Sequence, residues 1–249
     1  MHKTPLSLPS LVALAAGGLF IVVVMPRLRV GGVECSADEH VPAEVLECIR
    51  KRRSVFPRSY VPGNVPPAVM RQLLEAAMWA PYHGSAPPWR FVVLGRTAMV
   101  EMQRLSLSFY DANWREVGWA NGKCGSEQEY LAWRRMTEDE IDSRWRPASY
   151  MVAIVMRRQA GSKRVPEWEE LAATACAVQN MHLQASCEPS LACYWSSWHA
   201  AARDSDAMRE FLGMGREDRC LGFFIVATCE PSVDKRTRTE SHLNAEWRE

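Results

Sequence analysis

Hydrophobic positions recur at helical spacing in several stretches of the chain. The clearest is residues 66–80, where Pro66 and Pro67 suit a first helical turn and Pro81 ends the pattern. Further helices are expected over residues 42–54, 97–109, 167–187 and 204–214. Asp204 is the expected N-cap of the last of these.

Four short runs are strongly apolar and rich in β-branched or aromatic residues, which is typical of buried strands. They are residues 90–95, 148–156, 191–195 and 220–228. Helices outnumber these strands, so a central sheet buried between helices is expected. The fold class predicted from this pattern is α+β.

The first part of the chain follows a different pattern. Leu11 to Met25 is apolar without a charge, and counting from Leu6 gives a stretch of about 20 residues, enough to cross a bilayer. The run ends in "VVVMPRLR", a poor cleavage site. We therefore expect Leu6 to Met25 to be an uncleaved membrane anchor, and residues 1–33 to lie outside the folded domain. The sequence does not identify the membrane or compartment. A removed targeting segment is the alternative.

Residues 110–146 hold four tryptophans among many charges: Trp114, Trp119, Trp133 and Trp145. Exposed aromatics need a surface to cover them. The segment predicts a helical excursion over the core that acts as a lid or contacts a partner.

Charge and cysteine usage exclude several classes of protein. Lys and Arg total 30 against 29 for Asp and Glu, which argues against a nucleic-acid binder but leaves room for a small-anion site. None of the eight cysteines forms a Cys-x-x-Cys pair. Those in apolar runs, such as Cys176 and Cys220, are expected to be buried free thiols. No second histidine lies at ligand spacing, so no metal is predicted.

Basic residues gather in "IRKRRS", where Arg52 and Arg53 precede Ser54. Guanidinium groups match phosphate oxygens, and a hydroxyl adds a donor. The alternative is a basic helix end that complements the helix dipole.

Two other polar groups are candidates for ligand contacts. His83 in "PYHGS" contacts a ligand, donates a proton or caps a loop. In "YWSSW", Ser196 and Ser197 lie between aromatic rings, which suits a planar polar ligand or the edge of an aromatic core with a serine turn.

Together, five segments resemble the FMN-dependent nitroreductase family, in family order over about residues 42–249. The segments are "RKRRSVFPRSY", "LLEAAMWAPYHGSAPPWRFVVL", "VPEWEELAATACAVQNMHLQA", "YWSSW" and "REFLGMGREDRCLGFFIVAT". The resemblance implies a mostly antiparallel sheet flanked by helices, in a homodimer with FMN at the interface.

The resemblance also implies an activity and a set of site residues. NAD(P)H reduces FMN, which then reduces a small nitro, quinone or related acceptor, with no catalytic base. The expected FMN contacts are Arg52, Arg53, Ser54, His83, Ser85, Trp195, Ser196, Ser197, Arg236 and Arg238. The alternative function is a flavin-binding or scaffold protein on the same fold with little turnover.

The chain departs from the family pattern in two places. The loop has Ser85 and Pro87-Pro88-Trp89 where the family often has Asn and Gln-Pro-Trp. Glu188-Pro189-Ser190 replaces glycines that the family usually has. This second segment either weakens the flavin site, since proline lacks a backbone donor, or forms an ordinary surface turn.

Overall fold

The computed structural model describes residues 43–161, 164–231, 245–246 and 248. All of them belong to one compact unit, Pro42–Glu249. The expected anchor at Leu6 to Met25, and Arg236 and Arg238, lie outside the described residues. Within the described part of the chain, no helix is long and apolar enough to cross a membrane.

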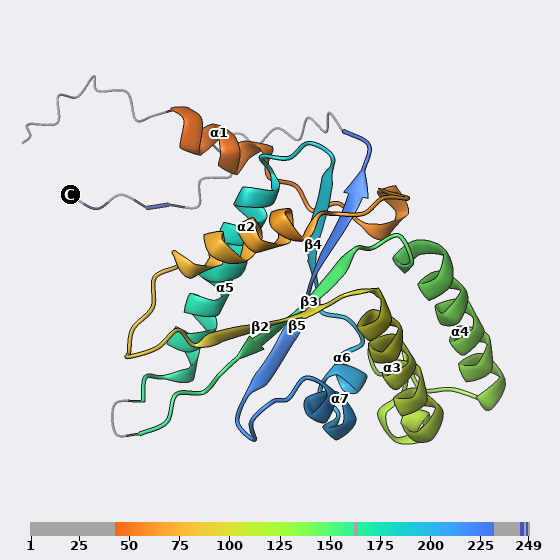
Figure 1. The fold of residues 1–249 in the computed structure, drawn as a ribbon. Helices are drawn as coiled ribbons and strands as arrows, with labels where there is room; N and C mark the ends of the chain where they lie inside the picture. Colours follow the sequence, from red (N-terminus) through yellow and green to blue (C-terminus); the bar gives the residue numbers. More distant parts are fainter. Residues whose placement is uncertain (1–42, 162–163, 232–244, 247, 249) are drawn as a thin grey trace, which may run out of the picture. The chain divides into compact units, whose positions relative to one another are not determined.

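Five strands form one sheet, and every described strand pair is antiparallel (Figure 1). The strands are β1 (Tyr60–Val61), β2 (Trp89–Leu94), β3 (Tyr150–Met156), β4 (Leu191–Ser196) and β5 (Arg219–Cys229). The long strand β5 pairs with β3, β4 and β1, and β2 extends the sheet beyond β3. The antiparallel sheet expected from the family resemblance is confirmed, while β1, too short for a period-2 pattern, was not predicted.

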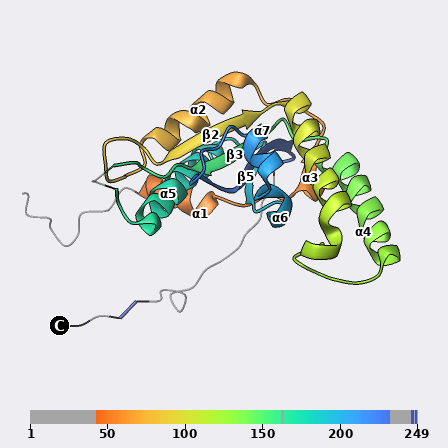
Figure 2. The same ribbon diagram turned by 90° about the horizontal axis from the view of Figure 1, so that it is seen from below.

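Helices cover the sheet on both faces. They are α1 (Ala43–Lys51), α2 (Pro67–Met78), α3 (Arg96–Val117), α4 (Glu127–Glu140), α5 (Glu167–Ala185), α6 (Ala200–Arg203) and α7 (Asp206–Phe211). A 3-10 turn, Pro57–Ser59, and a π-helical turn, Ile141–Trp145, complete the described elements. Figures 1 and 2 both place α3 and α4 to one side of the sheet and α2 and α5 to the other.

Alternation along β3 explains why the sheet is covered twice. Met151 and Ala153 pack in a core with side chains of α3 and α7, whereas Val152 and Ile154 pack in a second core with α2 and α5. Successive side chains of a strand point to opposite faces. Because both faces are buried, β3 is apolar at almost every position, as predicted.

One predicted helix cap is wrong by one residue. Ser205, not Asp204, is the N-cap of α7, and its Oγ accepts a hydrogen bond from the Met208 N–H at 3.3 Å. Asp204 instead ends α6 and pairs with Arg203 at 2.7 Å. Both residue types cap helices well, so only the backbone geometry distinguishes them.

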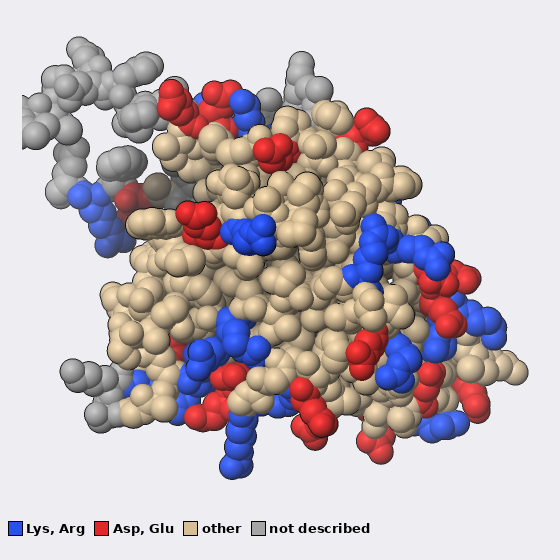
Figure 3. Space-filling model, viewed as in Figure 1, with Lys and Arg blue, Asp and Glu red and all other residues tan. Residues whose placement is uncertain are grey.

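The Trp-rich excursion is helical, as predicted, but its aromatics do not need a partner surface. Trp114 stacks on Tyr130 with ring centroids 4.8 Å apart, and Trp119 is buried beside both. Figure 3 shows the outer surface over α3 and α4 covered by charges of both signs. Trp114 and Trp119 are therefore covered within the chain, which removes that argument for a partner.

Apolar residues are exposed elsewhere. On α5, Trp168 and Leu171 are 68% and 44% exposed. Cys176, expected to be buried, is exposed on the same helix, whereas Cys220 is buried as expected. Trp168, Leu171 and Cys176 of α5 are thus uncovered in the single chain.

Candidate functional site

The segment Arg52–Ser54 follows α1 and is held against β4 and α5. The Val55 N–H donates to the Cys193 carbonyl of β4 at 3.1 Å. His182 of α5 donates from Nε2 to the carbonyls of Arg53, at 2.8 Å, and Cys193, at 3.1 Å. One imidazole therefore ties the basic segment to both neighbouring elements.

His182 was not singled out in the sequence, yet it is the centre of this arrangement. Since both of its partners are carbonyl acceptors, Nε2 carries the proton. Burial lowers the pKa of His182, and the nearby charge of Arg52 lowers it too, while the two hydrogen bonds oppose these effects. The ring is neutral at pH 7 and acts as a fixed donor.

The Arg53 guanidinium lies at the end of α1. Its Nη1 donates to the carbonyls of Arg50 and Arg52, the latter at 2.9 Å. These contacts match the helix-end interpretation of the basic run. Arg52 and Arg53 are half-buried and Ser54 is exposed, and guanidinium and hydroxyl donors of this kind fit a phosphate group.

The end of β4 carries the second predicted group. The Trp195 indole donates to the Leu221 carbonyl at 2.9 Å, and Ser196 Oγ accepts from the Trp198 N–H at 3.1 Å. Ser196 is thus a buried turn serine, and Ser197 is exposed. Gly222 of β5 (φ +120°) lets the backbone at Ser196 pack closely against it, because a Cβ at position 222 would lie 2.2 Å from the Ser196 carbonyl oxygen.

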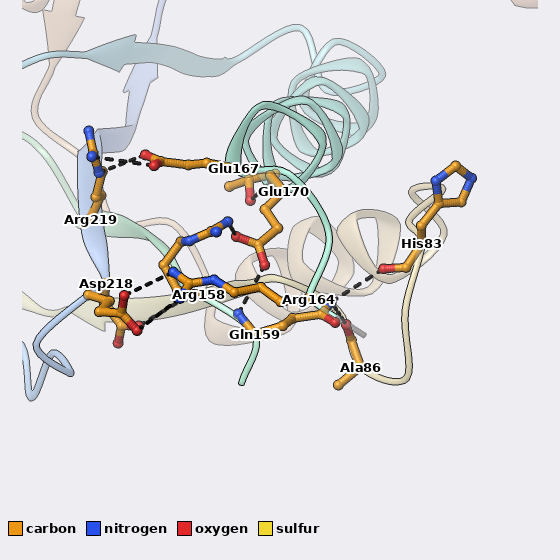
Figure 4. A network of polar contacts seen from close by, with 11 residues as sticks. His83, Ala86, Arg158, Gln159, Arg164, Glu167, Glu170, Asp218 and Arg219 are labelled. Atoms are coloured by element: carbon orange, nitrogen blue, oxygen red, sulfur yellow. Dashed lines mark hydrogen bonds and ion pairs between the residues drawn. The ribbon is translucent and has the colours of Figure 1, made fainter. Parts of the chain in front are cut away.

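The loop after α2 carries the third group. His83 and Ser85 are exposed. His83 Nδ1 lies 2.9 Å from Glu169 Oε2, at the start of α5. The side-chain amide of Gln159 donates to the carbonyls of Ala86 and His83 (Figure 4). Gln159, in a loop, and His182, in α5, were both missed because an isolated polar residue gives no sequence signal.

One chain brings together only part of the predicted site. The basic segment contacts Cys193, two residues before Trp195, which is about 7 Å along a strand. His182 and Glu169 lie in the last and first turns of α5. The rise of the helix between these two residues therefore separates the basic segment from the His83 loop by about 20 Å.

Glu188-Pro189-Ser190 forms an exposed turn between α5 and β4. The Ser190 carbonyl accepts from the Cys229 N–H at 2.9 Å. The turn precedes β4, whereas Trp195 and Ser196 end it, so this geometry favours the surface-turn alternative.

Among the described residues, no group of three or more His, Cys, Asp and Glu side chains could hold a metal ion.

Matches to known proteins cover most of the unit Pro42–Glu249. The family model described as "Nitroreductase family" matches residues 49–228. The protein YdjA of Escherichia coli strain K12 is 24% identical over 163 residues, which is 64% of this chain and 75% of that protein.

Two solved structures share the fold. A nitroreductase with bound FMN from Bacteroides fragilis has a TM-score of 0.56 at 22% identity, covering 82% of this chain and 99% of its own. The FMN-dependent nitroreductase NfnB from Mycobacterium smegmatis, in complex with NADPH, has a TM-score of 0.55 at 17% identity, covering 83% and 99%. The match to the family model spans more than half of the chain, and the protein belongs to the nitroreductase family.

Proposed function

We propose that the protein is an FMN-dependent NAD(P)H oxidoreductase that reduces a small nitro, quinone or related acceptor. Family membership supports this, as do the FMN and NADPH named for the related structures. The observation that carries the proposal is the proximity of Arg52, Arg53 and Ser54 to the Trp195–Ser197 end of β4, joined through Cys193.

The basic segment would hold the FMN phosphate. The guanidinium groups of Arg52 and Arg53 neutralise its charge, and the Ser54 hydroxyl adds a donor. The neutral His182 ring keeps the backbone of this segment against Cys193. Trp195, two residues further along β4, and Ser197, directly after the strand, would lie toward the ring end of the cofactor.

Bound FMN supplies the hydride chemistry, and the protein supplies binding and orientation. The scheme therefore requires no catalytic base among these residues.

We also propose a homodimer in which the His83 loop of one chain completes the site of its partner. Within one chain this loop lies about 20 Å from the basic segment, measured as the rise of α5 between Glu169 and His182. The exposed Trp168 and Leu171 on α5, next to Glu169 and the loop, supply apolar area for such an interface.

The test compares the FMN content of purified variants. Arg52→Ala combined with Arg53→Ala should lower FMN occupancy at least tenfold, since each charge-assisted contact contributes roughly 1.5–3 kcal/mol. Lys51→Ala is the matched control, because Lys51 is exposed and pairs with Glu47 at 2.7 Å. Melting curves check that loss of the Arg53 contacts to α1 does not unfold the protein. Equal FMN content in both variants would overturn the assignment.

Colour and reduction separate the alternatives. A yellow protein bleached by NAD(P)H is an enzyme, a yellow protein inert to NAD(P)H is a flavin binder, and a colourless protein that takes up no FMN is a scaffold.

A further inference from the structure

The loop of residues 83–88, between α2 and β2, has no regular secondary structure to fix its shape. Two of its carbonyls share one donor: Gln159 Nε2 donates to Ala86 O at 2.9 Å and to His83 O at 3.3 Å. Gln159 is 73 residues from Ala86 in the sequence. A single side-chain amide from outside the loop therefore bridges His83 and Ala86 (Figure 4).

The loop backbone is shaped to receive this amide. Gly84 has φ of +106°, and a Cβ built on it would lie 2.4 Å from Gln159 Oε1. A larger residue at position 84 would be strained by its conformation and would also displace the glutamine. The absence of a side chain at Gly84 is what lets Gln159 lie beneath the turn.

The backbone of Gln159 is itself held by a buried carboxylate. Its backbone N–H donates to Glu170 Oε1 at 2.9 Å. The other carboxylate oxygen of Glu170 pairs with Arg158, and these two side chains are 0% and 9% exposed. The Arg158 N–H donates to Asp218 Oδ1 at 3.3 Å. The segment after β3 is thus fixed to both α5 and the start of β5.

We propose that Gln159 is a positioning residue of the flavin site, which holds the 83–88 loop in the conformation that contacts FMN. The contact between the loop and FMN rests on the proposed function. The clamp itself rests on the hydrogen bonds and on the conformation of Gly84. Glu170 acts one step further away, by fixing the backbone of Gln159.

The structure explains why the loop needs an outside clamp. The side chains of His83 and Ser85 are exposed, and the His83–Glu169 contact to α5 is the other side-chain hydrogen bond described for the loop. Without the amide of Gln159, the carbonyls of His83 and Ala86 would turn to water, and the loop would sample other conformations.

The test is Gln159→Leu in the full chain, with Gln128→Leu as the matched control because Gln128 is exposed on α4, on the other side of the sheet from α5. Hydrogen exchange of the loop amides of residues 83–86 should become about tenfold faster in Gln159→Leu, the effect of losing roughly one net hydrogen bond. FMN should dissociate more readily by a similar factor. The control should change neither quantity.

A second variant separates positioning from general stabilisation. Gln159→Glu keeps the length of the side chain but loses the donor when ionised, and regains an O–H donor when protonated. Loop exchange relative to the natural protein at the same pH should therefore return toward normal on acidification. Gln159→Leu should show no such recovery.

Unchanged loop exchange in Gln159→Leu would overturn the clamp. Faster loop exchange with unchanged FMN affinity would overturn the positioning role. A protein that binds no FMN in any variant would refute the proposed function instead, and the exchange measurement on that protein would still test the clamp.

Discussion

Removing the Glu170 carboxylate should destabilise the protein strongly, because it leaves a guanidinium buried without its counter-charge. The Glu170 side chain is 0% exposed and that of Arg158 is 9% exposed. Breaking one partner of a buried ion pair costs about 3–5 kcal/mol. Glu170→Ala also removes the acceptor of the Gln159 N–H, about 1 kcal/mol more. Together these effects should lower the free energy of unfolding by about 4–6 kcal/mol.

Urea denaturation followed by tryptophan fluorescence measures this change. Glu217→Ala is the control: it removes the exposed pair with Arg164, at 2.9 Å, and should cost less than about 1 kcal/mol. Replacing both buried partners, as Arg158→Met with Glu170→Leu, should recover much of the loss, because no charge is left unpaired. A loss below about 1 kcal/mol for Glu170→Ala would refute the claim that this pair anchors the segment after β3.

Three further perturbations test other parts of the account. Gly84→Ala should lower the melting temperature and loosen the loop, since the φ of +106° costs an L-residue roughly 1 kcal/mol or more; an unchanged melting curve would contradict this. Burial lowers the pKa of His182 on folding, so below about pH 6.5 the unfolded state binds a proton that the folded state does not. The stability of the protein therefore decreases as the pH is lowered. His182→Gln should therefore lose less stability between pH 7 and pH 5, as urea midpoints would reveal; equal losses would exclude the buried neutral ring. Trp168→Arg should yield monomers in light scattering, while Val100→Arg should not, although Val100 on α3 is about as exposed as Trp168. A dimer in both variants would show that Trp168 is not in the interface.

Elements with many apolar positions could be predicted from the sequence. The helix opened by Pro67 and the apolar strand β3 lie where the pattern indicates, because burial imposes a period on them. The two-residue strand β1 has no period to detect. The Trp-rich excursion was correctly expected to be helical, but its sequence could not indicate that Trp114 and Tyr130 cover each other.

The site depended on contacts that periodicity does not encode. His182 meets the Arg53 carbonyl across 129 residues of sequence, and Gln159 meets Ala86 across 73. Single polar residues that bind backbone carbonyls leave no pattern in the chain. The basic segment was found because Arg52 and Arg53 are adjacent in sequence, yet only the fold could indicate that the His83 loop lies at the other end of α5.

The central claim, that this chain binds FMN and passes electrons through it, is tested most directly by the visible absorption spectrum of the purified protein before and after anaerobic addition of NAD(P)H. The account predicts a flavin spectrum that bleaches on addition of the reductant and returns when a nitro or quinone acceptor is added. A protein that remains colourless after incubation with FMN, or a flavin spectrum that neither NADH nor NADPH bleaches, would contradict it.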